Sequence, residues 1–326
     1  MRNPRFGCYA LSICVAAAML AGCGGSQPPV VPGARADFRT AVGGNATFHY
    51  TGEEQEFVVP TGVTRISVVV RGAAGGGCTA NKTYSGRTFG NGGRVYAVIP
   101  VRPKERLIIY VGGGGSRLGP GFNGGGSGGG SAADGGGGAS DVRTPPGRRQ
   151  NRILVAAGGG GQGGNNREDS SSDNTYTGCG GGGGLVGGRG APGNTYGGSN
   201  GGLGGAGGTQ TEGGAGGAGG SPPDFEGAGG VSPDFGRPCR RSGSRGADGA
   251  RGVGGRGGTM RSPPYVGGGG GGGYFGGGGG GSACNGYGGG GGGGGGSSYA
   301  ESRATKVHYW QNWKNATGNG LVVFSW

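Results

Sequence analysis

The chain has 326 residues, of which 101 are glycine and only 17 are proline. Glycine has no side chain to bury and loses the most conformational freedom on folding, so this composition excludes a conventional apolar core over most of the chain. Collagen is excluded for the chain as a whole, because the glycine runs 267–273 and 288–296 have no triplet period. The net charge of +13 favours anionic partners.

The N-terminus resembles the signal of a bacterial lipoprotein. Arg2 and Arg5 precede an apolar run, 11–20, that is too short to span a bilayer. The sequence LAGC at 20–23 then resembles a lipobox, in which small residues precede a cysteine whose thiol is acylated before cleavage. We therefore expect residues 1–22 to be removed and Cys23 to carry lipid, palmitate included. An ordinary signal peptide with an accidental cysteine is the alternative.

Lipid on Cys23 predicts a membrane-attached protein of the bacterial cell envelope, at the outer membrane or the cell surface. Residues 23–46 begin with a Gly-, Ser- and Pro-rich stretch and are expected to form a flexible tether. Export argues against intracellular RNA as a partner. The expected partners are therefore the membrane through its lipid anchor and an anionic polysaccharide or protein ligand at the surface, with no nucleic acid.

Seven cysteines are present, and three of them have an expected fate: Cys8 and Cys14 leave with the signal, and Cys23 is lipidated. The four that remain in the exported chain are disulfide candidates with three possible connectivities. No CxxC pair occurs among them, which argues against a zinc site. These candidates are Cys78, Cys179, Cys239 and Cys284.

Strand-like runs rich in Val, Ile and aromatic residues alternate with glycine turns in residues 47–160, and one more run closes the chain. No amphipathic helix is evident between them. The pattern predicts an all-β sandwich, formed by 47–160 with 298–326 and split by an insert. The expected strands are 47–50, 55–59, 64–70, 93–101, 106–111, 152–157 and 320–326.

The insert, 161–297, holds long glycine runs. A helix with three residues per turn is open to glycine, and it places positions i and i+3 on one edge. The expected edges carry Leu203 with Ala206, Ala215 with Ala218, and Arg245 with Asp248 and Arg251. The last set is either a charged ladder outside a glycine bundle or a solvated loop. Flexible coil is the alternative for the whole insert.

Several of these motifs, in order, are similar to those of the glycine-rich domain family found in the anaplastic lymphoma kinase and leukocyte tyrosine kinase receptors. The motifs are FHYTG at 48–52, FVVP at 57–60, GAAGG at 72–76, GGASDVR at 137–143, the stretch 152–161 and GNGLVV at 318–323. The resemblance implies a tumour-necrosis-factor-like, or jelly-roll, β-sandwich that carries a bundle of polyglycine II helices. It also implies ligand display, although this sequence has a lipobox in place of a kinase, so receptor signalling does not carry over.

Catalytic patterns are scarce. His49 and His308 are the only histidines, and neither a Gly-x-Ser-x-Gly elbow nor a His-Glu-x-x-His motif occurs. The acidic stretch 168–173 lacks the ligand spacing of an EF-hand. We therefore expect no catalytic residue, no cofactor and no metal site.

The sequence thus predicts a non-enzymatic, lipid-anchored envelope protein that serves adhesion, ligand display or matrix contact. Two alternatives stay open: a purely structural glycine-rich spacer without a specific ligand, and an exported hydrolase with an unfamiliar site.

Overall fold

The computed structural model describes residues 43–77, 90–117, 119–164, 178, 180–193, 201–221, 242–260, 265–284, 289–313 and 318–326. The chain divides into two compact units, Met1–Thr40 and Ala41–Trp326, and every described residue belongs to the second. Cys23 and the expected signal peptide therefore lie outside the described residues. In the part that is described, no helix has the length and apolar character needed to cross a membrane.

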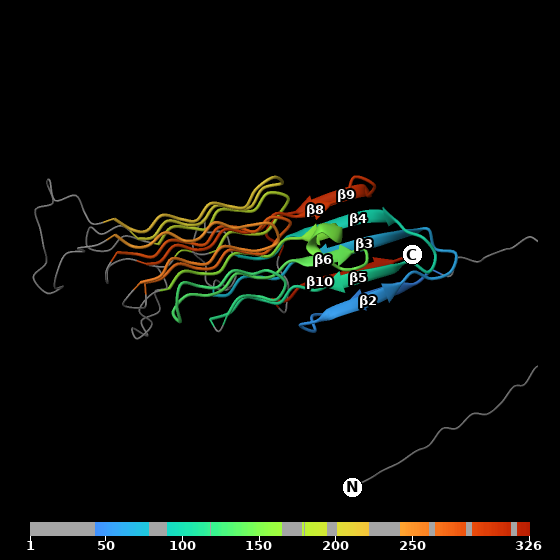
Figure 1. Cartoon of the computed structure of the whole chain (residues 1–326), viewed down its shortest axis with the longest axis horizontal. Helices are drawn as coiled ribbons and strands as arrows, with labels where there is room; N and C mark the ends of the chain where they lie inside the picture. Colours follow the sequence, from blue (N-terminus) through green and yellow to red (C-terminus); the bar gives the residue numbers. More distant parts are fainter. Residues whose placement is uncertain are drawn as a thin grey trace, which may run out of the picture. The chain divides into compact units, whose positions relative to one another are not determined.

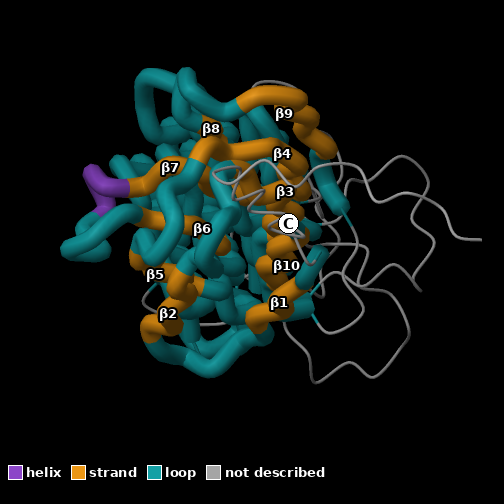
Figure 2. The backbone as a smooth tube through the Cα atoms, turned by 90° about the vertical axis from the view of Figure 1, so that its right-hand side faces the viewer, coloured by secondary structure: helices purple, strands orange, loops and turns teal. Residues whose placement is uncertain are grey.

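Two five-stranded antiparallel sheets form one end of this unit (Figures 1 and 2). The first sheet has the order β1 (Asn45–Phe48), β10 (Leu321–Ser325), β3 (Arg65–Arg71), β4 (Arg94–Pro100) and β9 (Thr305–Trp310). The second has the order β2 (Glu54–Val58), β5 (Arg106–Tyr110), β6 (Ser140–Arg143), β7 (Arg152–Ala156) and β8 (Tyr299–Ala300). One 3-10 turn, η1 (Arg149–Asn151), precedes β7. The all-β class expected from the sequence is confirmed.

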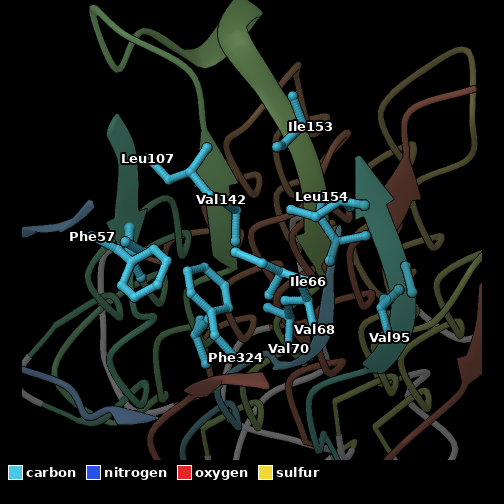
Figure 3. Close-up of a cluster of buried hydrophobic side chains, with 14 of the residues drawn as sticks. Phe57, Ile66, Val68, Val70, Val95, Leu107, Val142, Ile153, Leu154 and Phe324 are labelled. Carbon is cyan, nitrogen blue, oxygen red and sulfur yellow. The ribbon is translucent and has the colours of Figure 1, made fainter. Parts of the chain in front are cut away.

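A single apolar core lies between the two sheets (Figure 3). Alternation along β3 turns Ile66, Val68 and Val70 inward, and each of them is completely buried. They meet Leu154 of the opposite sheet, while Phe324 packs edge-on against Phe57 with ring centroids 4.9 Å apart. Burial of each such side chain stabilises the folded state by about 1.5–3 kcal/mol, so this core provides the hydrophobic stabilisation of the two sheets.

Glycine-rich segments continue from the strand ends and run side by side away from the sheets (Figure 1). We call this hydrogen-bonded set of segments the glycine array. Its members are 72–77, 90–93, 111–117, 119–139, 157–164, 178–193, 201–220, 243–259, 266–284 and 289–297, as far as they are described. The array therefore also takes in segments that precede the expected insert, 161–297, because the glycines after β3, β5 and β7 bond to those within it.

Segment 267–272 lies in the interior of the array. Its successive amides donate in rotation to three neighbouring segments, 255–258, 291–294 and 134–137. Its successive carbonyls accept in the same rotation from three others, 126–129, 277–280 and 158–161. All twelve N···O distances lie between 2.7 and 3.0 Å. The segment thus has six neighbours and satisfies every peptide group without a side chain.

The interior has no space for a Cβ atom. A Cβ on Gly270 would lie 2.0 Å from the Gly277 carbonyl oxygen, and one on Gly293 would lie 2.0 Å from that of Gly269. Both obstacles are backbone atoms that are themselves hydrogen-bonded, so they cannot move aside. The long glycine runs of the sequence are therefore explained by the close approach of neighbouring backbones.

Side chains occur on the outer edges of the array with a spacing of three. Ala215 and Ala218 are both exposed, and Leu203 is exposed on a neighbouring segment. Asp248 forms an exposed ion pair with Arg245 and accepts a hydrogen bond from the Gly216 amide. The described backbone on both sides of this pair is bonded into the array, which supports the charged-edge interpretation over a solvated loop.

Three strands were not expected from the sequence: β6, β8 and β9. β6 is buried at all four residues, including charged Asp141 and Arg143, so it lacks an apolar run. β8 has only two residues, and β9 carries polar residues on its exposed positions. His49, expected within the first strand, follows the end of β1 at Phe48 and is exposed.

Candidate functional site

The outer face of the first sheet presents a cluster of aromatic and arginine side chains that we call the aromatic–arginine face. It comprises Arg71, Arg94, Tyr96, His308, Trp310 and Trp313. The strand register brings most of these side chains together. Arg94 of β4 lies between Arg71 of β3 and Trp310 of β9, and Tyr96, two residues along β4, lies opposite His308 of β9. Since side chains alternate between the two faces of a sheet, all five point away from the core.

Four rings form a continuous row on this face. The centroids of Tyr96 and His308 lie 6.3 Å apart, those of His308 and Trp310 lie 6.0 Å apart, and those of Trp310 and Trp313 lie 6.3 Å apart. His308 is exposed, and the other three rings are half-buried. The row therefore offers partly accessible ring surface on β4, on β9 and just after β9.

Arg94 lies against both tryptophans. Its Cζ atom is 4.4 Å from the ring centroid of Trp310 and 4.6 Å from that of Trp313. The Cζ atom of Arg71 is 6.0 Å from the ring centroid of Trp313. These cation–π contacts hold two positive charges beside the aromatic row.

Within the described part of the chain, no carboxylate pairs with the positive charges of Arg71 and Arg94. Neither guanidinium makes a hydrogen bond or an ion pair with a described residue, and both Nε atoms are buried without a partner. Burial, and then the neighbouring charge of Arg71, lower the pKa of Arg94 below its ordinary value. Like charges directly opposite one another in a sheet are destabilising, so the pairing of Arg71 with Arg94 carries a cost in stability.

The glycine array positions one end of the face. The Trp313 amide donates to the Gly92 carbonyl at 2.6 Å, and the Asn312 amide donates to the Gly183 carbonyl at 2.8 Å. The Asn312 Oδ1 atom accepts from the Asn91 amide at 3.1 Å. Asn312 has a φ of 54°, which asparagine tolerates better than most residues. The turn that carries Trp313 is thus tied to array segments at three points.

A buried arginine of the second sheet provides a contrast. Arg143 stacks on Tyr110, with Cζ 3.7 Å from the ring centroid. Its guanidinium donates to both carboxylate oxygens of Asp141, to the Gly147 carbonyl and to Asn123 Oδ1, at 2.6–3.0 Å. Asp141 and Arg143 therefore form a buried ion pair within one strand of the second sheet. Arg143 is fully satisfied by the fold, whereas Arg71 and Arg94 are not.

A second arginine fastens the array to the sandwich. Arg152 donates to the carbonyls of Gly273 and Tyr274, where an interior glycine segment ends, at 2.7 and 3.1 Å. Burial is the largest influence on this guanidinium and lowers the pKa of Arg152 to about 10. Its role is structural, because every contact is to backbone carbonyls or a packed ring.

Most of the cysteines singled out from the sequence fall outside the part of the chain that the structure describes. Cys23, Cys78, Cys179 and Cys239 lie outside the described residues. Cys284 is fully buried and disulfide-bonded, and the pairing of the four candidates stays a prediction. The acidic stretch 168–173 is also outside the described part, and within that part no three His, Cys, Asp or Glu residues are grouped to hold a metal ion.

The sequence offers His308 no catalytic motif, and the structure places it, exposed, in the aromatic row. Arg71 and Arg94 were not singled out. One feature of the sequence points to this face: two of the three tryptophans in the chain, Trp310 and Trp313, follow closely after His308. No family model matches the chain, and no curated protein matches it either.

Proposed function

We propose that this chain is a lipid-anchored, non-enzymatic protein of the bacterial cell envelope that holds a ligand-binding module away from the membrane. Lipid on Cys23 would provide attachment, the part of the expected tether that precedes Ala41 would link it to the fold, and the unit Ala41–Trp326 would be the display module. The proposal combines the lipobox-like sequence with a compact unit that carries a solvent-facing aromatic cluster.

We further propose that the glycine array is a bundle of polyglycine II helices. The support is the rotation of hydrogen-bond partners with a period of three, since a helix with three residues per turn directs successive amides to three different neighbours. The sandwich is proposed to be tumour-necrosis-factor-like. The support for that part is the pair of five-stranded antiparallel sheets and the resemblance of the sequence motifs.

The observation that supports a stiff module is the complete pairing of the interior segments, and the observation that favours display is the aromatic–arginine face. Segment 267–272 uses all of its amides and carbonyls with six neighbours. Each bond contributes a net ~0.5–1.5 kcal/mol, against ~1–2 kcal/mol of backbone entropy for each ordered residue. Stability therefore requires that many segments pack together, and such a set behaves as one stiff body rather than as independent loops.

Membrane fractionation of cells that express the full chain tests the anchor. The wild-type chain should sediment with membranes, carry a palmitate label and begin at Cys23, whereas Cys23→Ser should carry no label and keep residues 1–22, because acylation precedes cleavage. Palmitate label on Cys23→Ser, or removal of residues 1–22 from it, would contradict the proposal. Cys284→Ser is the matched control, because it changes a cysteine of the folded unit and should leave membrane attachment intact.

A stiff spacer without a ligand is the second candidate, and the fully paired array favours it as much as it favours display. Binding separates the two. Cells that carry the chain should adhere to a surface coated with acidic polysaccharide more strongly than cells that lack it. Equal adhesion on every coating tested would leave only the spacer function.

A further inference from the structure

We infer that the aromatic–arginine face binds an anionic polysaccharide, with its sugar rings on the aromatic row and its carboxylates on Arg71 and Arg94. The inference rests on the proposed display function and names the ligand class that the module would hold. It depends on three observations: the row of rings, the two uncompensated guanidinium groups, and the contrast with Arg143.

The aromatic row suits a linear chain of sugar rings. Its centroid spacings of 6.3, 6.0 and 6.3 Å are of the same order as the length of one pyranose ring. The C–H faces of a pyranose pack on aromatic rings, and amphipathic aromatics offer large contact area at a low cost in conformational entropy. Because the rings follow one another along β9 and its pairing with β4, an extended ligand can contact more than one of them.

Arg71 and Arg94 determine that the ligand is an anion. A guanidinium binds a carboxylate through two parallel hydrogen bonds, which gives direction as well as attraction. In the second sheet, Asp141 gives Arg143 this bidentate partner from within the protein. No described residue gives one to Arg71 or Arg94, although both also lie beside aromatic rings, at 6.0 and 4.4 Å from the ring centroids. A ligand carboxylate would supply a partner to the terminal nitrogens of Arg71 and Arg94, while their buried Nε atoms stay out of its reach.

The face is also held ready for binding. Arg94 is packed between Trp310 and Trp313, and Trp313 follows a turn that is bonded to the array. Little side-chain freedom remains to be lost on binding, which is the condition under which a modest contact area gives useful affinity.

Calorimetric titration of the purified full chain in detergent with alginate oligosaccharides tests the inference, and neutral dextran oligosaccharides are the matched ligand control. Alginate should bind and dextran should bind at least tenfold more weakly. Trp310→Ala, Trp313→Ala and Arg94→Gln should each weaken alginate binding at least tenfold, and His308→Ala, which removes an exposed ring, about threefold. Thermal unfolding of every variant shows whether the loss reflects binding alone.

Two control variants separate a site from general attraction. Arg102→Gln removes the same charge from an exposed position, and Tyr50→Ala removes an exposed ring from outside the face; both should change affinity less than twofold. Equal losses in Arg102→Gln and Arg94→Gln would overturn the inference. So would equal binding of dextran, or binding only to anionic lipid vesicles. Failure here with normal membrane attachment would leave the anchor of the proposed function intact.

Discussion

The sandwich and the glycine array are two hydrogen-bonded structures in one compact unit, and they are held together by opposite means. In the sandwich, side chains such as Phe324 and Leu154 fill the space between two sheets and are completely buried. In the array, Gly270 and its neighbours leave no space for a side chain at all, because the backbones approach each other directly. The sandwich is stabilised by side chains that fill its core, whereas the interior of the array can form only where side chains are absent.

This difference reverses the usual effect of a substitution. Removing atoms from the sandwich leaves a cavity, whereas adding a single atom to the array interior forces two backbones apart. On the outer edge of the array, neither removing nor adding side-chain atoms should change the stability much, since these side chains point into solvent. The four predictions that follow test these three environments, from the largest expected effect to the smallest.

Phe324→Ala should lower the free energy of unfolding by about 3–5 kcal/mol. The ring is fully buried and packs edge-on against Phe57 and Phe48, at centroid distances of 4.9 and 5.4 Å. Denaturant unfolding followed by tryptophan fluorescence measures the change. A loss below about 1 kcal/mol would show that the sheets do not depend on this core.

Gly270→Ala should cost about 3 kcal/mol, the upper part of the usual range for overpacking, because its Cβ would lie 2.0 Å from the Gly277 carbonyl oxygen. Gly119→Ala is the matched control, because a Cβ there meets nothing within 4 Å. The control should change stability by less than about 0.5 kcal/mol in the same denaturant titration. Equal effects of the two substitutions would contradict the close packing of the interior.

Asp248→Ala should cost less than about 1 kcal/mol, because the ion pair with Arg245 is exposed and screened by solvent. The Gly216 amide, and then Arg245, hold the pKa of Asp248 below its ordinary value. A lowered folded-state pKa contributes stability above the ordinary value near 3.9, and that contribution is lost as the pH falls through the folded-state pKa. The difference between wild type and variant should therefore be present at pH 6 and shrink on acidification, which unfolding titrations at several pH values would measure. A difference that grows on acidification would contradict this assignment.

Ala218→Leu should change stability by less than about 0.5 kcal/mol, because Ala218 is exposed on the array edge. Its neighbour gives the sharpest comparison. Gly217→Ala adds fewer atoms than Ala218→Leu, yet its Cβ would lie 2.0 Å from the Leu203 carbonyl oxygen. Thermal unfolding of the two variants should rank them in the reverse order of the volume added, and the opposite ranking would place residue 218 in the interior.

Much of this architecture was accessible from the sequence. The alternation of Ile66, Val68 and Val70 predicted a half-buried strand, and the structure has β3 there. The spacing of Ala215 and Ala218 predicted a shared edge, and both are exposed. These expectations succeeded because the local pattern alone determines which positions share a face or an edge.

The extent of the array could not be predicted in the same way. Glycine segments that follow β3, β5 and β7 bond with segments of the expected insert far along the chain. Glycine carries no side-chain pattern, so the sequence does not indicate which runs become neighbours. β6 was missed for a related reason, because Asp141 and Arg143 are charged and yet buried as a bonded pair.

The aromatic–arginine face also required the structure. Arg71, Arg94 and Trp310 are brought side by side by the register of three strands, one of which, β9, was not expected. The register between β4 and β9 shifts between Tyr96 and Val98, where Lys306 has a φ of 52°. A shift of this kind depends on local backbone geometry that no residue pattern in the sequence indicates.

Amide hydrogen exchange tests most directly whether the glycine segments form an ordered, hydrogen-bonded body. The amides of 267–272 and 290–296 are all bonded to neighbouring segments, so they should exchange as slowly as those of the sandwich core, such as Val68 and Leu154. The exchange rates can be followed residue by residue in the purified full chain. Uniformly slow exchange in both interior segments is the expected result, and exchange there at the rate of unstructured peptide would contradict the central claim.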